Sequence, residues 1–111
     1  MTTGILYVET RPVSAEREAE FHRWYEEVHI PEVVALEGFV SGRRYAPVTD
    51  EGPYVAIYEI DAEDPSTAFQ ALIEAIGAGR LQMTDAMQMD PAPTLRLLKQ
   101  LSSYEPAEQG V

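Results

Sequence analysis

Apolar and β-branched residues recur at short intervals in four stretches of the chain, and this pattern predicts four β-strands. They cover residues 3–10, 39–46, 54–60 and 94–104. The last stretch also fits helical spacing through its leucines, so a helix is the alternative there. A strand places alternate side chains on opposite faces. The second strand is therefore expected to carry four residues on one face: Phe39, Ser41, Arg43 and Tyr45.

Two further stretches carry the spacing of amphipathic helices. The first follows Ser14, which can cap it, and Pro31 is expected to disturb or end it because proline cannot continue the hydrogen-bond ladder. Its apolar stripe is formed by Phe21, Trp24, Tyr25 and Val28. The second helix begins at Asp64 and Pro65, as cap and first helical residue. Its sheet-facing residues are expected to be Phe69, Leu72, Ile73 and Ile76.

The order strand, helix, strand, strand, helix, strand predicts an α+β ferredoxin-like fold, with both helices on one face of a four-stranded antiparallel sheet. A chain of 111 residues forms one domain with a single core. We place this domain at residues 1–105, and we expect the polar residues 106–111 to form a flexible tail.

Composition excludes several classes of function. The net charge is -11, which disfavours nucleic acid and anionic membranes as partners. The chain has no cysteine, so disulfides and thiolate metal sites are excluded. No stretch approaches the ~18 consecutive apolar residues of a membrane span, and the start does not read as a secretory signal. We therefore expect a cytoplasmic protein.

Both histidines lie on the first predicted helix, at the edge of its apolar stripe. His29 falls in the last turn, where an imidazole with an ordinary pKa of ~6.5 is suited to proton transfer; the alternative is that it caps the end of the helix. His22 is the weaker candidate for lining a site, and its alternative is an exposed helix position. The two are ~10 Å apart along the helix, too far to hold one metal, so no metal site is expected.

Aromatic residues near His29 extend the candidate site. Tyr25 lies one turn before His29, so its hydroxyl can reach the same pocket. Trp24 is expected to pack in the core or form an apolar wall. Tyr45 and Tyr58 lie on neighbouring strands, where they either meet across the sheet and bind an oxyanion or contribute to a dimer interface.

A basic residue and three methionines complete the candidates. Arg43 shares the predicted strand face of Tyr45, and its guanidinium suits a carboxylate or phenolate; the alternative is a solvated salt bridge. The methionines either form a pliable lid over an apolar ligand or fill a gap in the core. They are Met83, Met87 and Met89.

The residues Phe21-x-x-Trp24-Tyr25-x-x-x-His29-x-Pro31, followed by Gly38-Phe39 and Arg43-Arg44-Tyr45, resemble the EthD-like branch of the dimeric α+β barrel superfamily. Glu37 departs from the pattern, because proline is common at this place. The resemblance implies a homodimer formed by the open faces of two sheets, with an apolar pocket between the sheet and the helices of each subunit. It also places His29 at the position of the family's helix-end histidine.

Proteins of this superfamily include lactone isomerases, polyketide cyclases, cofactor-free oxygenases and haem-binding enzymes. By this resemblance we expect a cofactor-independent enzyme that isomerises or cyclises a cyclic or aromatic carbonyl metabolite by proton transfer. His29 would be the acid and base, Tyr25 or Tyr45 would bind the oxyanion, and Trp24 with Tyr58 would form the apolar wall. The alternatives are a cofactor-free monooxygenase of aromatic substrates and a non-catalytic ligand-binding or accessory dimer. Haem binding is a more distant alternative.

Overall fold

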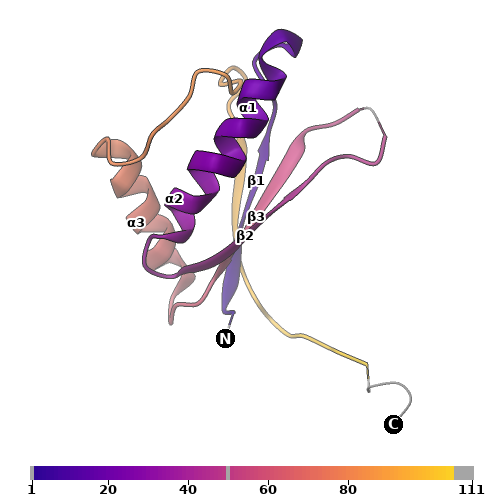
Figure 1. The fold of residues 1–111 in the computed structure, drawn as a ribbon. Coiled ribbons are helices and arrows are strands. Elements are labelled where there is room, and N and C mark those ends of the chain that lie inside the picture. The colour runs from indigo at the N-terminus through magenta and orange to yellow at the C-terminus, as the bar shows by residue number, and fades with distance from the viewer. Residues whose placement is uncertain (1, 50, 107–111) are drawn as a thin grey trace.

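The computed structural model describes residues 2–49 and 51–106. Its sheet has four antiparallel strands in the order β2-β3-β1-β4, and the helices lie on one side of it (Figure 1). The strands are β1 (Gly4–Thr10), β2 (Phe39–Tyr45), β3 (Tyr54–Ile60) and β4 (Thr94–Lys99). This is the predicted ferredoxin-like fold, and the ambiguous stretch from residue 94 is a strand. The predicted tail, apart from Pro106, lies outside the described residues.

The core lies between the sheet and the helices. Alternate residues of β1 and β3 point into it; Leu6 and Val8 of β1 are 1% and 7% exposed. The largest fully buried side chains are Tyr25, Tyr58, Phe21, Leu6, Ile60 and Val33. Across the described ranges, no helix is long and apolar enough to cross a membrane.

Strand β2 does not keep the predicted alternation. Its register against β3 shifts between Phe39 and Ser41, as a β-bulge does when it inserts one residue. Phe39 therefore faces the helices, whereas Arg43 and Tyr45 face the open side of the sheet. The predicted common face of Phe39 and Arg43 was wrong, and Arg44 takes the helix-facing position instead.

The first helical segment starts differently from the prediction. Ser14 occupies the cap position, but its side chain makes no capping hydrogen bond. The chain opens with a 3₁₀ turn (Ala15–Arg17), and α1 (Glu18–Trp24) follows directly. The predicted Ser14 cap was therefore wrong, because the tight first turn uses backbone bonds such as Arg17 N–H to Ser14 O.

The segment also continues past Pro31. After α1 comes one π-helical turn (Tyr25–His29), and α2 (Ile30–Val34) completes the segment. Pro31 lies in the first turn of α2, where a missing N–H is tolerated. The wider π turn ahead of it, closed by Ile30 N–H to Tyr25 O, shifts the side chains that follow. Such turns are frequent at functional sites.

Helix α3 (Pro65–Gly77) begins as predicted, with the Asp64 carboxylate accepting from Ser66 N–H at 3.0 Å. Its packing face differs in part from the prediction. Ile73 is 44% exposed, because the closest approach to the sheet runs along small residues and one leucine. These buried residues are Ala68, Leu72 and Ala75, with Phe69 and Ile76 packed at their edge.

The segment between α3 and β4 has little regular structure. Met87 is 8% exposed and packs in the core, which agrees with the gap-filling alternative for this residue. Met83 and Met89 are 43% and 60% exposed. Pro12 pairs with Met87 as an isolated bridge, so this segment is tied to the chain that follows β1.

Candidate functional site

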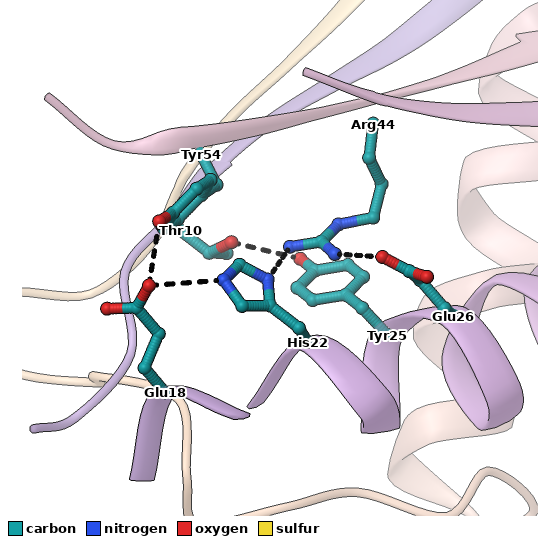
Figure 2. Close-up of polar contacts among 7 residues, drawn as sticks. All are labelled: Thr10, Glu18, His22, Tyr25, Glu26, Arg44 and Tyr54. Atoms are coloured by element: carbon teal, nitrogen blue, oxygen red, sulfur yellow. Dashed lines mark hydrogen bonds and ion pairs between the residues drawn. The ribbon is translucent and has the colours of Figure 1, made fainter. Parts of the chain in front are cut away.

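Arg44 reaches from β2 to the sheet-facing side of the first helical segment and forms the centre of a polar cluster (Figure 2). Its side chain is only 14% exposed. One guanidinium nitrogen, Nη2, lies 2.9 Å from His22 Nδ1, and Nη1 donates to Glu26 at 3.0 Å. The guanidinium carbon lies 4.6 Å from the centroid of the Tyr25 ring, a cation–π contact. The cation is therefore held on three sides.

These contacts define the tautomer of His22. Because the Arg44 guanidinium can only donate, His22 Nδ1 accepts a hydrogen bond from it, and Nε2 carries the ring proton. Nε2 lies 3.4 Å from Glu18 Oε2, and the Tyr54 hydroxyl donates to the same oxygen at 2.9 Å. This hydrogen bond raises the pKa of Tyr54, which remains a donor. The result is an imidazole held between a carboxylate and a guanidinium.

The cluster borders an open hollow at the end of β2 and the start of β3. Its lining comprises His22, Glu26, Arg44, Tyr45, Ala46 and Tyr54. Glu18, His22 and Glu26 are four residues apart along the helix, so they point from one helical face toward this hollow. The site therefore offers a fixed cation, a basic nitrogen and aromatic surface, all reachable from solvent.

Tyr25 forms the floor of the cluster. Its hydroxyl accepts a hydrogen bond from Thr10 at 3.2 Å (Figure 2), and burial raises its pKa. The rings of Tyr25 and His29 meet edge to face at 5.4 Å. The hydroxyl, expected from the sequence to reach a pocket shared with His29, instead lies on the side of Thr10 and Arg44.

His29 has a different environment from the one expected. Its ring stacks on Trp24, with centroids 4.4 Å apart and an interplanar angle of 18°. Burial lowers the pKa of His29 to about 4, against a smaller opposing effect of Glu32. Its Nδ1 is buried and has no hydrogen-bond partner within residues 2–49 and 51–106. The capping alternative was wrong, because the helical segment continues to Val34.

Tyr58 and Tyr45 do not meet. Tyr58 is 1% exposed and faces the core, with its ring centroid 6.4 Å from that of His29. Its hydroxyl, like His29 Nδ1, finds no partner in the described part of the chain, and burial raises its pKa. Tyr45 lies on the open side of the sheet and is 48% exposed. It touches the site only at the rim of the hollow.

Arg43 is an open-face residue that forms an ion pair with Glu59. Arg43 was expected in the site and Arg44 was not, because nothing in the sequence marks the bulge. Glu18, Glu26 and Tyr54 were not predicted as site residues either. The four-residue spacing of Glu18, His22 and Glu26 was a usable signal for a polar helix face. Among the described residues, no group of three or more metal-ligating side chains is close enough to hold a metal ion.

Comparison with known proteins supports the fold. The family model described as "Domain of unknown function (DUF4286)" matches residues 4–75, which contain the whole cluster. No curated protein matches the sequence. A solved structure of the heme-degrader MhuD from Mycobacterium tuberculosis, with two hemes bound in its active site, has a TM-score of 0.61 and 19% identity, covering 91% of this chain and 99% of that chain. At this identity the likeness shows the fold alone. Neither match identifies the EthD-like branch.

Proposed function

The chain belongs to the DUF4286 family, and we propose that it is a small enzyme that moves a proton on a cyclic or aromatic carbonyl compound, with His22 as the base. The observation that carries this proposal is the fixed orientation of His22 between Glu18 and Arg44. A carboxylate on one ring nitrogen prepares the other nitrogen to accept a proton, and it stabilises the imidazolium that forms.

The contacts of Arg44 define the chemical step. A substrate carbonyl oxygen takes over the hydrogen bond that Arg44 Nη2 donates to His22, and this frees the lone pair of Nδ1. His22 then removes a proton from the carbon beside the carbonyl, and the C–H electron pair becomes an enolate. Arg44 faces the negative oxygen in a partly buried setting, where such stabilisation is strongest. Return of the same proton to another carbon completes an isomerisation without any change in oxidation state.

Aromatic side chains give the hollow its preference for flat rings. The rings of His22 and Tyr54 meet edge to face, with centroids 4.6 Å apart. Tyr45 and Ala46 add apolar surface at the rim. A planar ring placed beside Tyr54 brings its carbonyl oxygen toward Arg44 and leaves the rest of the molecule at the open side.

His29 does not act as the base. An imidazole with a pKa of about 4 is neutral near pH 7, and it is a weak base there. Trp24, Tyr58 and His29 instead form the apolar layer behind the site.

Haem is not part of the proposal, although the similar structure of MhuD holds two hemes. Haem iron needs an available axial ligand. Both ring nitrogens of His22 lie within hydrogen-bonding distance of Glu18 and Arg44. His29 lies flat on Trp24 with Nδ1 buried. The two histidines therefore do not fit the role of axial ligand. A Soret shift on titrating the wild type with haem, absent in His29→Gln, would contradict this conclusion.

We also propose that two copies associate through the open sheet faces. Strands β1, β3 and β4 carry partly exposed apolar residues there: Ile5, Tyr7, Val55, Ile57 and Leu98. Burying such a surface is favourable. Sedimentation is expected to give a dimer that Ile57→Arg dissociates and that Val48→Arg, in an exposed loop, leaves intact. A monomeric wild type would contradict the proposal.

The test of the enzymatic proposal is proton exchange. The protein is incubated in D2O with cyclic and aromatic ketones, and loss of the α-proton signal is followed by ¹H NMR. His22→Gln is expected to lower the exchange rate by about 10²–10⁴, the contribution of a general base. His29→Gln is the matched control and is expected to retain the rate within a few-fold. Equal rates in wild type and His22→Gln would contradict the assignment.

A further inference from the structure

The structure assigns a substrate class to this site: we propose that it binds a cyclic or aromatic monocarboxylate, and that Glu26 occupies the place of the ligand's carboxylate in the free protein. This inference deepens the proposed function and rests on it for the location of the chemistry. It concerns recognition, however, and binding can be measured without turnover.

The cation of the site is held far more firmly than the anion that it contacts. Arg44 is 14% exposed and lies over the Tyr25 ring, with His22 on one of its nitrogens. Glu26 is 67% exposed and reaches Arg44 with a single oxygen at 3.0 Å. An exposed ion pair of this kind contributes little to stability. A carboxylate from solution can therefore replace that of Glu26 while Arg44 stays in place.

The charges around Arg44 favour a carboxylate over a phosphate. Two side-chain carboxylates, Glu18 and Glu26, already lie within the cluster. A monocarboxylate replaces Glu26 charge for charge at Nη1 of the guanidinium. A dianion brings one more negative charge against Glu18 and against a protein whose net charge is -11.

The remaining lining determines the other half of the ligand. Tyr45, Ala46 and Tyr54 border the hollow next to Arg44. A ring attached directly to the carboxylate lies against these side chains when the carboxylate contacts Nη1. Nη2 and His22 then remain beside the ring for the proton transfer. A short aliphatic acid such as acetate reaches Arg44 and leaves this surface uncovered.

The experiment titrates the full-length protein with benzoate at fixed ionic strength and follows binding by calorimetry. Removing the competing carboxylate by Glu26→Gln is expected to tighten benzoate binding about three- to fivefold, the strength of an exposed ion pair. Glu27→Gln is the matched control, because this exposed neighbour carries the same charge and lines a different surface. It is expected to leave the affinity within about 1.5-fold, the scale of a screened distant charge. Arg44→Lys keeps the charge but has a single nitrogen, which cannot face the carboxylate and His22 at the same time, and it is expected to weaken binding at least tenfold.

Three outcomes would overturn the inference: equal tightening by Glu26→Gln and Glu27→Gln, benzoate binding that Arg44→Lys leaves unchanged, or tighter binding of inorganic phosphate than of benzoate. Near-UV circular dichroism checks that the Arg44→Lys variant is folded. If that variant does not fold, the exposed Glu26→Gln variant still tests the inference. The proposed function fails separately. If benzoate binds and His22→Gln does not change the rate of proton exchange, His22 is not the base but the carboxylate site stands. If His22-dependent exchange on ketones occurs and benzoate does not bind, the carboxylate site is refuted and the base stands.

Discussion

His22 and His29 lie on the same helical segment, seven positions apart, and the fold gives them opposite properties. His22 has a partner near each ring nitrogen, and its side chain is 30% exposed. His29 lies against Trp24 with Nδ1 buried and unpartnered among the described residues, and burial lowers its pKa to about 4. Helix position alone therefore does not distinguish the two histidines. Their contacts do, since Glu18 from α1 and Arg44 from β2 lie beside the ring nitrogens of His22.

The first way to break this comparison is to remove the stacking partner of His29. Trp24 is 6% exposed, and its Nε1 donates to Gln82 O at 2.8 Å. Trp24→Ala is expected to lower the free energy of unfolding by about 3–5 kcal/mol, because it leaves a cavity and an unpaired carbonyl. His22→Ala, on the same segment, is expected to cost only about 1 kcal/mol. Urea denaturation measures both, and similar losses would show that the two environments are alike.

The second prediction uses the pKa of His29. The folded protein holds this imidazole neutral down to a pKa of about 4, whereas the unfolded chain protonates it near ~6.5. Between these values the unfolded state binds more protons, so stability falls as the pH is lowered through this window and is fully retained above it. The fall amounts to about 3 kcal/mol.

Urea midpoints measured from pH 7 down to pH 4 test this expectation. His29→Gln is expected to show a flatter profile than the wild type, because glutamine does not titrate. Carboxylates contribute equally to both proteins, so the difference between the profiles isolates His29. Parallel profiles would mean that the imidazole is hydrated in the folded state.

The sequence predicted the fold well, because periodicity records which side chains face the core. The four strands form in the predicted order, and Asp64 caps its helix as expected. Pro31 was expected to disturb or end the helix, and it disturbs the helix without ending it. The π turn accommodates this proline through a backbone change that depends on tertiary packing.

The site was less predictable, because it depends on the register of one strand. A one-residue bulge exchanges Arg43 for Arg44 on the face toward the helices. His22 was noticed in the sequence, but its acidic neighbours suggested an exposed helix face. Glu18 instead contacts His22, and Glu26 pairs with Arg44. Arg44 and Tyr54 come from two strands that are distant in sequence; Arg44 contacts His22, and Tyr54 donates to Glu18. The spacing of residues within one helix or strand does not specify which side chains of another element they contact.

The smallest expected effect is that of Tyr54→Phe, and this variant separates the environment of His22 from that of His29 most sharply. Tyr54→Phe removes only the hydroxyl that donates to Glu18 at 2.9 Å and keeps the ring beside His22. If Tyr54 positions the carboxylate that orients His22, exchange is expected to slow about three- to tenfold, the scale of one hydrogen bond to a charged group. The urea profile governed by His29 is expected to stay unchanged, because Tyr54 contacts Glu18 and His22.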